Sequence, residues 1–234
     1  MSFYNDMKNK SYIGITFIVL VIGIWIVPKI VDRVNKKDII EDTRMNKVTS
    51  GSLSYLKIEG QKRKMPNFTF RNQDSLLISN SDYKEKVYVV EFFFTTCPSI
   101  CPIMNRNMIK LQEVFGENTN FGIASFTINP EVDTPIILKK YAEKYGVTSL
   151  NWHMLTGNID DIYKLSNKGL NIFAEINPEV EGGFEHQGYF ALIDNKGFLR
   201  SRRDKHGNPI VYYQGLEDIE IEFLKEDIAK LLAE

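Results

Sequence analysis

A nearly continuous run of β-branched and aromatic residues at positions 87–94 constrains most strongly how this chain can fold. Such a run is typical of a strand that is covered on both faces. Beyond it, apolar residues recur at helical spacing from Pro102 until Gly116. We therefore predict a buried strand that leads directly into a helix, with Cys97 and Cys101 at the junction.

The remaining patterns continue this alternation of strand and helix. Further strands are predicted at 67–70 and 121–128, a hairpin at 189–200, and helices at 135–145, where Asp133-Thr134-Pro135 supplies a cap, at 159–169 and from 219 to the carboxyl end. A βαβα order followed by a hairpin and a terminal helix predicts an α/β, thioredoxin-like fold. In that fold a central mixed sheet is flanked by helices.

The amino-terminal part of the chain has a different character. An uncharged apolar stretch runs from Tyr12 to Val27, and it extends to Val31 if the side chain of Lys29 reaches the lipid headgroups. As a helix rising about 1.5 Å per residue, this stretch is just long enough to cross a bilayer. We predict four parts, namely a short tail at 1–11, a transmembrane anchor at 12–31, a stalk at 32–62 and a thioredoxin-like domain at 63–234.

Two other interpretations of the apolar stretch stay open, a cleaved signal peptide and a helix of a soluble domain. No small-x-small cleavage site follows the stretch and no polar face interrupts it, which favours an uncleaved anchor. The flanking charges do not fix its orientation, because basic residues lie on both sides: Lys8 and Lys10 before it, and Lys29, Arg33, Lys36 and Lys37 after it. Placement of the domain outside the cytoplasm therefore depends on its chemistry.

Composition excludes several classes of protein. With 43% hydrophobic and 12% aromatic residues, the chain can bury a core, which excludes a disordered protein. The 29 basic and 30 acidic residues leave a net charge of −1, so no broad surface for nucleic acid is predicted. The chain contains only two cysteines, and both must therefore belong to one small site.

The spacing of Cys97 and Cys101 indicates a chemically active pair. Residues four apart lie on one side of a helical turn, near enough to chelate one ion or to form a disulfide. A thiol at the start of a helix lies beside free backbone N–H groups, which favour the thiolate. Two thiolates prefer soft ions, and Cu(I) needs few ligands, whereas structural zinc ordinarily takes four.

Only three histidines can complete such a site. His186 lies between glycines just before the predicted strand at 189, in a loop that faces the cysteine junction in a thioredoxin-like sheet. We therefore expect His186 to be the third ligand. His153 belongs to a predicted buried strand, and His206 lies in a segment with the composition of a turn. Neither is expected to bind metal.

Three separate motifs resemble the SCO/SenC family of copper-binding assembly factors for cytochrome c oxidase. They are Phe93-Phe94-Thr95-Thr96-Cys97-Pro98-Ser99-Ile100-Cys101-Pro102, then Asn129-Pro130-Glu131-Val132-Asp133-Thr134-Pro135 with the segment 141–146, and His186 before Leu192-Ile193-Asp194. The resemblance runs from about Pro66 to the end. It implies a membrane-tethered thioredoxin-like domain outside the cytoplasm that binds copper through Cys97, Cys101 and His186.

The chain departs from the family pattern at a few positions. Asn129 and Glu185 stand where aspartate is frequent, and Ser99 replaces a common acidic residue. These changes affect the surroundings of the ligands and the choice of partner more than the ligands themselves. The segment 200–208 is longer and more basic than usual, and we expect a solvated loop there, with a docking surface as the alternative.

These observations favour a copper chaperone in the cytoplasmic membrane, with its domain on the periplasmic side. Such a protein would bind Cu(I) or Cu(II) and deliver it to the copper-bearing subunit of cytochrome c oxidase or another acceptor, or maintain the thiols of that acceptor. The rival hypothesis is a tethered thiol–disulfide oxidoreductase in which Cys97 attacks, Cys101 resolves and a thiol reductant regenerates the pair. A peroxiredoxin-like peroxidase is disfavoured because Phe94 occupies the place of its threonine.

Overall fold

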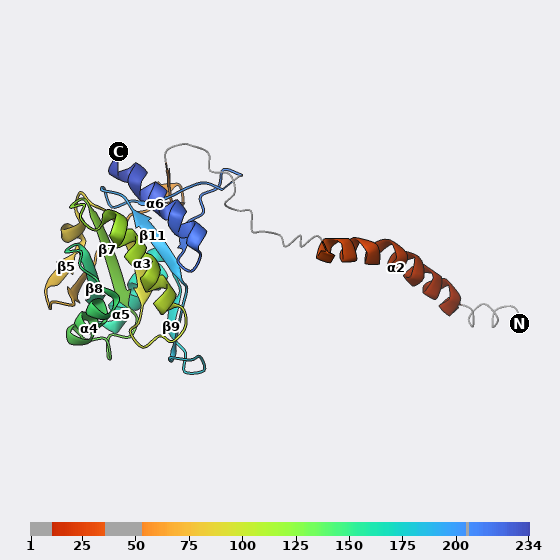
Figure 1. Ribbon diagram of the computed structural model, residues 1–234, viewed down its shortest axis with the longest axis horizontal. Helices are drawn as coiled ribbons and strands as arrows, with labels where there is room; N and C mark the ends of the chain where they lie inside the picture. The colour runs from red at the N-terminus through yellow and green to blue at the C-terminus, as the bar shows by residue number, and fades with distance from the viewer. Residues whose placement is uncertain (1–10, 36–52, 205) are drawn as a thin grey trace, which may run out of the picture. The chain divides into compact units, whose positions relative to one another are not determined.

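Figure 1 shows the computed structural model of the chain, which describes residues 11–35, 53–204 and 206–234. The chain divides into two units, Met1–Asn46 and Lys47–Glu234. The predicted tail therefore lies almost entirely outside the described residues, as does the part of the predicted stalk at 36–52.

The described part of the first unit is a single helix, α2 (Ser11–Asn35), which contains Pro28. Side chains are described for residues 14–28, and all of these residues are exposed except Gly23, which is half-buried. Among the described residues, no helix combines the length and the hydropathy that crossing a bilayer requires. The predicted anchor at 12–31 extends beyond the residues whose side chains are described.

The second unit contains a nine-stranded mixed sheet. Its strands in spatial order are β1 (Ser54–Tyr55), β12 (Leu199–Ser201), β11 (Tyr189–Ile193), β6 (Val87–Phe93), β7 (Phe121–Thr127), β8 (Trp152–Thr156), β4 (Thr69–Asn72) and β5 (Leu77–Ser79), and β13 (Tyr213–Gln214) pairs with β11. The central strands β6, β7 and β8 are parallel, and the strands on either side join antiparallel. This arrangement confirms the predicted mixed sheet.

Among the central strands, β6 and β7 are the most completely buried. Every residue of β6 and β7 is buried, and the strands pair in register from Val87 opposite Phe121 to Phe93 opposite Thr127. Strands buried on both faces require continuous apolar sequence, which is the pattern that predicted them. Phe126 makes ring contacts with Phe68, Phe70 and Phe92, which joins β7 to β4 and β6.

Helices flank this sheet. They are η2 (Asn80–Tyr83), α3 (Cys101–Phe115), α4 (Pro135–Tyr145), α5 (Ile159–Tyr163), the π-helical turn η3 (Lys164–Leu170) and α6 (Asp218–Leu232). The helix α3 packs against α6 and α4 (Figure 1), and α6 also contacts β6. The cysteine helix is thus held between two other helices, which fixes where its first turn can lie.

Two short hairpins complete the domain. One, β2 (Lys57–Ile58) with β3 (Gln61–Lys62), lies at the end of the segment predicted as a stalk. Next to it, Leu53 and Leu56 are buried against the core. The other hairpin, β9 (Ala174–Ile176) with β10 (Phe184–His186), extends from the domain near the start of α3 and carries a predicted ligand.

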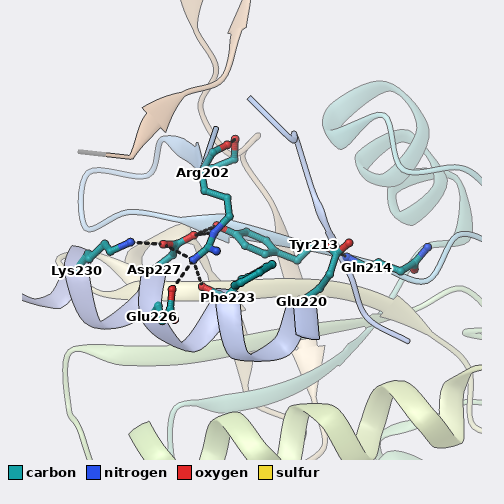
Figure 2. Close-up of polar contacts among 9 residues, drawn as sticks. Arg202, Tyr213, Gln214, Glu220, Phe223, Glu226, Asp227 and Lys230 are labelled. Atoms are coloured by element: carbon teal, nitrogen blue, oxygen red, sulfur yellow. Dashed lines mark hydrogen bonds and ion pairs between the residues drawn. The ribbon is translucent and has the colours of Figure 1, made fainter. Parts of the chain in front are cut away.

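Two arginines of the segment 200–208 are buried, at 3% exposure for Arg200 and 2% for Arg202. Figure 2 shows Arg202 reaching α6, where its Nε and Nη2 donate to Asp227 at 2.7 and 3.0 Å. Arg200 forms ion pairs with Asp194 and Glu234, each at 3.0 Å. The expectation of a solvated loop is therefore wrong for these two residues, because carboxylates inside the domain neutralise them.

Candidate metal centre

The turn between β6 and α3 contains Cys97, and it leads directly into α3, whose first residue is Cys101. The backbone N–H of Cys97 donates to the carbonyl of Phe94 at 3.2 Å, and α3 begins at Cys101 with Pro102 in its first turn. Proline is favoured at this position because its missing N–H has no intrahelical partner there. The backbone N–H of Cys101 donates to the Sγ of Cys97 at 3.5 Å, and both thiols are free.

Asp133 holds this turn against the neighbouring strand. Its carboxylate accepts a hydrogen bond from the backbone N–H of Thr95 at 3.0 Å, and it also accepts from the hydroxyls of Thr95 and Thr127. Asp133 was predicted to contribute to the cap of α4, but the residue that caps α4 is Thr134, without a side-chain hydrogen bond. The buried Asp133 instead joins the approach to Cys97 to the end of β7.

His186 reaches the cysteines from β10, 85 residues further along the chain than Cys101. Its Nε2 lies 3.2 Å from the Sγ of Cys101. The prediction placed His186 in the loop before the strand at 189, whereas the residue pairs with Ala174 of β9 in a short antiparallel hairpin. An edge-on ring contact with Phe94, at 5.8 Å between centroids, also orients the imidazole.

Gly182 lets the tip of this hairpin approach the cysteine turn. Its φ is +92°, a conformation that favours glycine, and a Cβ there would lie 3.1 Å from both the Phe94 ring and Pro98. The adjacent Gly183 has φ +78°, but a Cβ at that position would have no other atom within 4 Å. The glycines noted in the sequence therefore serve different purposes, close approach at Gly182 and chain reversal at both.

Cys97, Cys101 and His186 offer three ligand atoms that all lie within 4.8 Å of one another. In the part of the chain that the structure describes, no other group of three His, Cys, Asp or Glu side chains meets this criterion. His153 lies on β8, where its Nδ1 is 3.2 Å from the amide nitrogen of Asn72, and His206 lies in an exposed turn. The structure thus brings together the three residues predicted as ligands and leaves the other two histidines apart.

The hydrogen bonds of His186 favour one tautomer. Its Nδ1 lies 3.3 Å from the carbonyl oxygen of Gln187, which can only accept. The proton therefore belongs on Nδ1, and the lone pair of Nε2 faces the Cys101 thiol. A metal-binding histidine commonly has this arrangement, with one ring nitrogen free to ligate and the other held by a carbonyl.

The two thiols have opposite acidities. A hydrogen bond from the Cys101 thiol, together with hydrogen bonds from backbone N–H groups, lowers the pKa of Cys97 to about 3 against the opposing effect of burial. Burial raises the pKa of Cys101 far above its usual range, and the neighbouring Cys97 raises it further. Cys97 is therefore the thiolate of the metal-free pair, and Cys101 keeps its proton and shares it with Cys97.

Glu91 is a buried acid near this site that none of the sequence motifs pointed to. Its side chain accepts a hydrogen bond from Ser125 at 2.7 Å, and Ser125 in turn accepts from the indole N–H of Trp152 at 3.0 Å. Burial raises the pKa of Glu91 to about 7, although the Ser125 hydrogen bond lowers it. A single carboxylate inside the apolar run 87–94 was the signal that could have identified it.

Comparison with known proteins identifies relatives of this chain. A family model described as SCO1/SenC matches residues 57–219. The chain is 37% identical over 132 residues to the SCO1 protein homolog of Bacillus subtilis, across 56% of this chain and 68% of that protein. It is 29% identical over 147 residues to a protein of Stutzerimonas stutzeri described as copper-binding, across 60% of this chain and 69% of that protein.

Solved structures share the fold of the second unit. A SCO1/SenC family lipoprotein from Bacillus anthracis superposes with a TM-score of 0.63 at 31% identity, over 73% of this chain and 95% of that one. BsSco, described as having a disulfide switch and as a member of the Sco family of cytochrome c oxidase assembly proteins, superposes with a TM-score of 0.60 at 29% identity. That match covers 73% of this chain and 94% of BsSco.

Proposed function

The chain belongs to the SCO1/SenC family, and from this premise we propose that it is a membrane-anchored copper chaperone. It holds copper through Cys97, Cys101 and His186 and delivers it to the copper site of cytochrome c oxidase, or maintains the thiols of that site. The observation that carries this proposal is the group of two sulfurs and one imidazole nitrogen within 4.8 Å of one another. The Stutzerimonas stutzeri relative, described as copper-binding, supports the choice of metal.

The donor set suits a soft ion that must later be released. Two sulfurs and one imidazole match the preference of copper, and three ligands leave a position where a ligand of the acceptor can bind. Cys97 is already a thiolate, whereas Cys101 must lose its proton when copper binds. Transfer then proceeds by exchange of one ligand at a time, so that the cargo is never free in solution.

Copper titration of the purified full chain with reduced thiols tests this function. The His186→Ala variant is expected to bind Cu(II) at least tenfold more weakly than the parent, because it loses one of three ligands. His206→Ala is the matched control, since His206 is exposed in a turn and lies outside the site. Equal affinities of the parent and His186→Ala would contradict the three-ligand site.

The partner and the location are part of the same proposal. BsSco is described as an assembly protein of cytochrome c oxidase, which supports an acceptor of that kind here, and the Bacillus anthracis relative is described as a lipoprotein, which supports membrane attachment. The apolar stretch 12–31 supports an anchor in the cytoplasmic membrane. The proposal that the domain lies on the outer side of that membrane rests on the copper chemistry of the site, because the charges that flank the stretch do not fix its orientation. Cell membranes washed with alkaline carbonate should retain the chain, and protease added to intact spheroplasts should remove the domain. Release by carbonate would contradict the anchor, and protection from protease would contradict the topology.

The difference in pKa between the Cys97 and Cys101 thiols favours a second candidate function, that of a thiol–disulfide oxidoreductase. The Cys97 thiolate would attack a partner disulfide, forming a mixed disulfide and releasing one partner thiolate. Cys101, once deprotonated, would attack the Cys97 sulfur, release the second partner thiolate and leave the pair oxidised. A thiol reductant must then regenerate the pair. Sustained reduction of a partner disulfide by metal-free protein, unchanged in His186→Ala, would favour this candidate over copper delivery.

A further inference from the structure

Gly215 connects α3, the helix that begins at Cys101, to the segment just after β10, the strand that carries His186. Its N–H donates to the carbonyl of Gly188 at 2.7 Å, and its own carbonyl accepts from the side-chain Nδ2 of Asn107 at 2.8 Å. Asn107 is buried on α3, six residues after Cys101, and Gly188 lies two residues after His186. Two hydrogen bonds, both made by the backbone of Gly215, therefore link the two elements that carry the ligands.

The surroundings of Gly215 leave little freedom at this link. A Cβ at Gly215 would lie 2.7 Å from the Phe190 ring and 2.9 Å from the Gly188 carbonyl. Real Cβ atoms do not approach so closely, so no side chain fits at position 215 unless its neighbours shift. The link thus depends on a glycine that packs directly against the start of β11.

A buried polar cluster on α6 holds the other side of β13. Figure 2 shows that the hydroxyl of Tyr213 and the guanidinium of Arg202 converge on Asp227. The Tyr213 hydroxyl donates to Asp227 at 2.7 Å, and the backbone N–H of Gln214 donates to Glu220 at 2.6 Å. Both residues of β13 are thereby tied to α6 as well as paired with β11.

Backbone strain just before β13 shows how firmly this segment is held. Val211 has φ +71°, which is unfavourable for a β-branched residue, and it is the centre of a γ-turn closed by the Tyr212 N–H and the Ile210 carbonyl at 3.0 Å. Such strain persists only where surrounding contacts impose it. The Ile210 N–H donates to the carbonyl of Arg202 at 3.1 Å, so the buried arginine also anchors this turn.

We propose that Asn107 and Tyr213 are positioning residues that hold His186 in reach of Cys101 through the backbone of Gly215. This inference rests on the proposed three-ligand site. Asn107 sets the distance between Gly215 and α3, and Tyr213 sets the distance between β13 and α6. Gly188, which is bonded to Gly215, and the imidazole of His186 two residues before it therefore keep a fixed place. Neither side chain contacts the ligand atoms, and their effect on copper must therefore pass through His186.

A double-mutant cycle on the full chain tests this dependence. Asn107→Ala is expected to weaken Cu(II) binding by about tenfold in the parent, the lower end of the effect of outer-shell partners, and by less than twofold in the His186→Ala background. Tyr213→Phe removes one hydroxyl and is expected to act in the same direction, in case Asn107→Ala does not fold. Asn72→Ala is the control, because Asn72 is equally buried but lies on β4. It should lower thermal stability without changing copper affinity.

Spectroscopy separates failure of the inference from failure of the proposed function. In metal-free reduced protein, the ¹⁵N shift of His186 Nε2 should change in Asn107→Ala and Tyr213→Phe but not in Asn72→Ala. In the copper form, the nitrogen hyperfine coupling of bound Cu(II) should weaken in the same two variants. Equal losses of affinity with and without His186, or an unchanged Nε2 shift in both variants, would overturn the inference. If His186→Ala binds copper as tightly as the parent, the proposed function is overturned instead, and the double-mutant cycle gives no result. The ¹⁵N shift of Nε2 would then still show whether Asn107 and Tyr213 position His186.

Discussion

At the scale of single residues, the two cysteines differ in chemistry although only three residues separate them. The sulfur of Cys97 receives hydrogen bonds, whereas the fully buried thiol of Cys101 lies against His186 and retains its proton. A thiolate that is stable in the metal-free protein gives copper an anionic ligand without a preceding proton loss. Cys97 is therefore the residue that should react first with any electrophile.

Alkylation at different pH values measures this difference. The pKa of Cys97 is lowered to about 3, so its thiolate persists above that value and its rate with iodoacetamide should be nearly constant from pH 8 to pH 5. An ordinary thiol would slow by roughly 1,000-fold over this range. Mass spectrometry of the labelled peptide provides the measurement. Cys101→Ser serves as the comparison, because replacing the Cys101 thiol changes the hydrogen bond that most lowers the pKa of Cys97.

The raised pKa of the buried Glu91 predicts that the stability of the domain depends on pH. Its pKa is raised by burial from 4.5 to about 7, so between these values the unfolded chain loses a proton that the folded protein keeps. The free energy of unfolding should therefore fall as the pH rises from about 4.5 to 7, by about 3 kcal/mol in total from this group. Glu91→Gln cannot ionise and should remove this dependence.

Urea unfolding at pH 5 and pH 8 measures the effect of Glu91. Glu91→Gln is expected to be more stable than the parent at pH 8 by about 2–3 kcal/mol and to differ little at pH 5. Ser125 can still donate to the amide oxygen, so the hydrogen bond at 2.7 Å can be kept. An equal difference between the two proteins at both pH values would show that ionisation of Glu91 is not involved.

At the scale of elements, the β9–β10 hairpin decides whether the site has two ligands or three. It carries His186 on one strand and approaches the cysteine turn through Gly182 at its tip. On its other side, the Asn167 side chain pairs with the backbone of Ala174 at 2.8 and 2.9 Å. The hairpin is thus held at both ends, and its register brings the imidazole over the start of α3.

Two glycine variants separate backbone strain from close contact in this hairpin. Gly182→Ala and Gly183→Ala both place a side chain at positive φ, which costs about 1–2 kcal/mol each. Only the methyl group at position 182 meets Phe94 and Pro98, at 3.1 Å. We expect Gly182→Ala to weaken Cu(II) binding about tenfold and Gly183→Ala to weaken it little. Equal affinities of the two variants, measured by competition titration, would exclude the contact as a determinant of the site.

At the scale of the whole domain, buried ion pairs join segments that are distant in sequence. Arg200 on β12 pairs with Asp194 and with Glu234 at the carboxyl end, and it also donates to the carbonyl of Leu53 at 3.0 Å. The segment before β1, the β11–β12 hairpin and the last residue of the chain therefore meet at one guanidinium. Removing it leaves buried acceptors without a donor.

Arg200→Ala should consequently lower the free energy of unfolding by about 3 kcal/mol. Lys110→Ala is the matched control, because Lys110 forms a comparable ion pair with Asp218 at 2.7 Å on the surface. That exposed pair should contribute less than about 1 kcal/mol. Urea unfolding of both variants gives the comparison, and similar losses would contradict a special contribution of the buried pair.

The order of elements was predictable from sequence because it depends on local patterns. The apolar runs at 87–94 and 121–128 correspond to β6 and β7, and the predicted helix at 135–145 corresponds to α4. Such runs, helical spacing, and glycine and proline at element ends act over a few residues. The placement of Cys97 and Cys101 at a strand-to-helix junction follows from the same short-range signals.

Local patterns along the chain therefore specified the alternation of strands and helices, the cysteine pair at a helix start and a short list of candidate third ligands. The packing of distant segments was needed to establish that His186 lies 3.2 Å from Cys101, that Arg202 is buried against Asp227, and that Glu91 is enclosed in the core. The difference is one of range. Periodicity reports which face of an element is buried, whereas the contacts of His186 and Arg202 join side chains 85 and 25 residues apart and depend on how the elements pack.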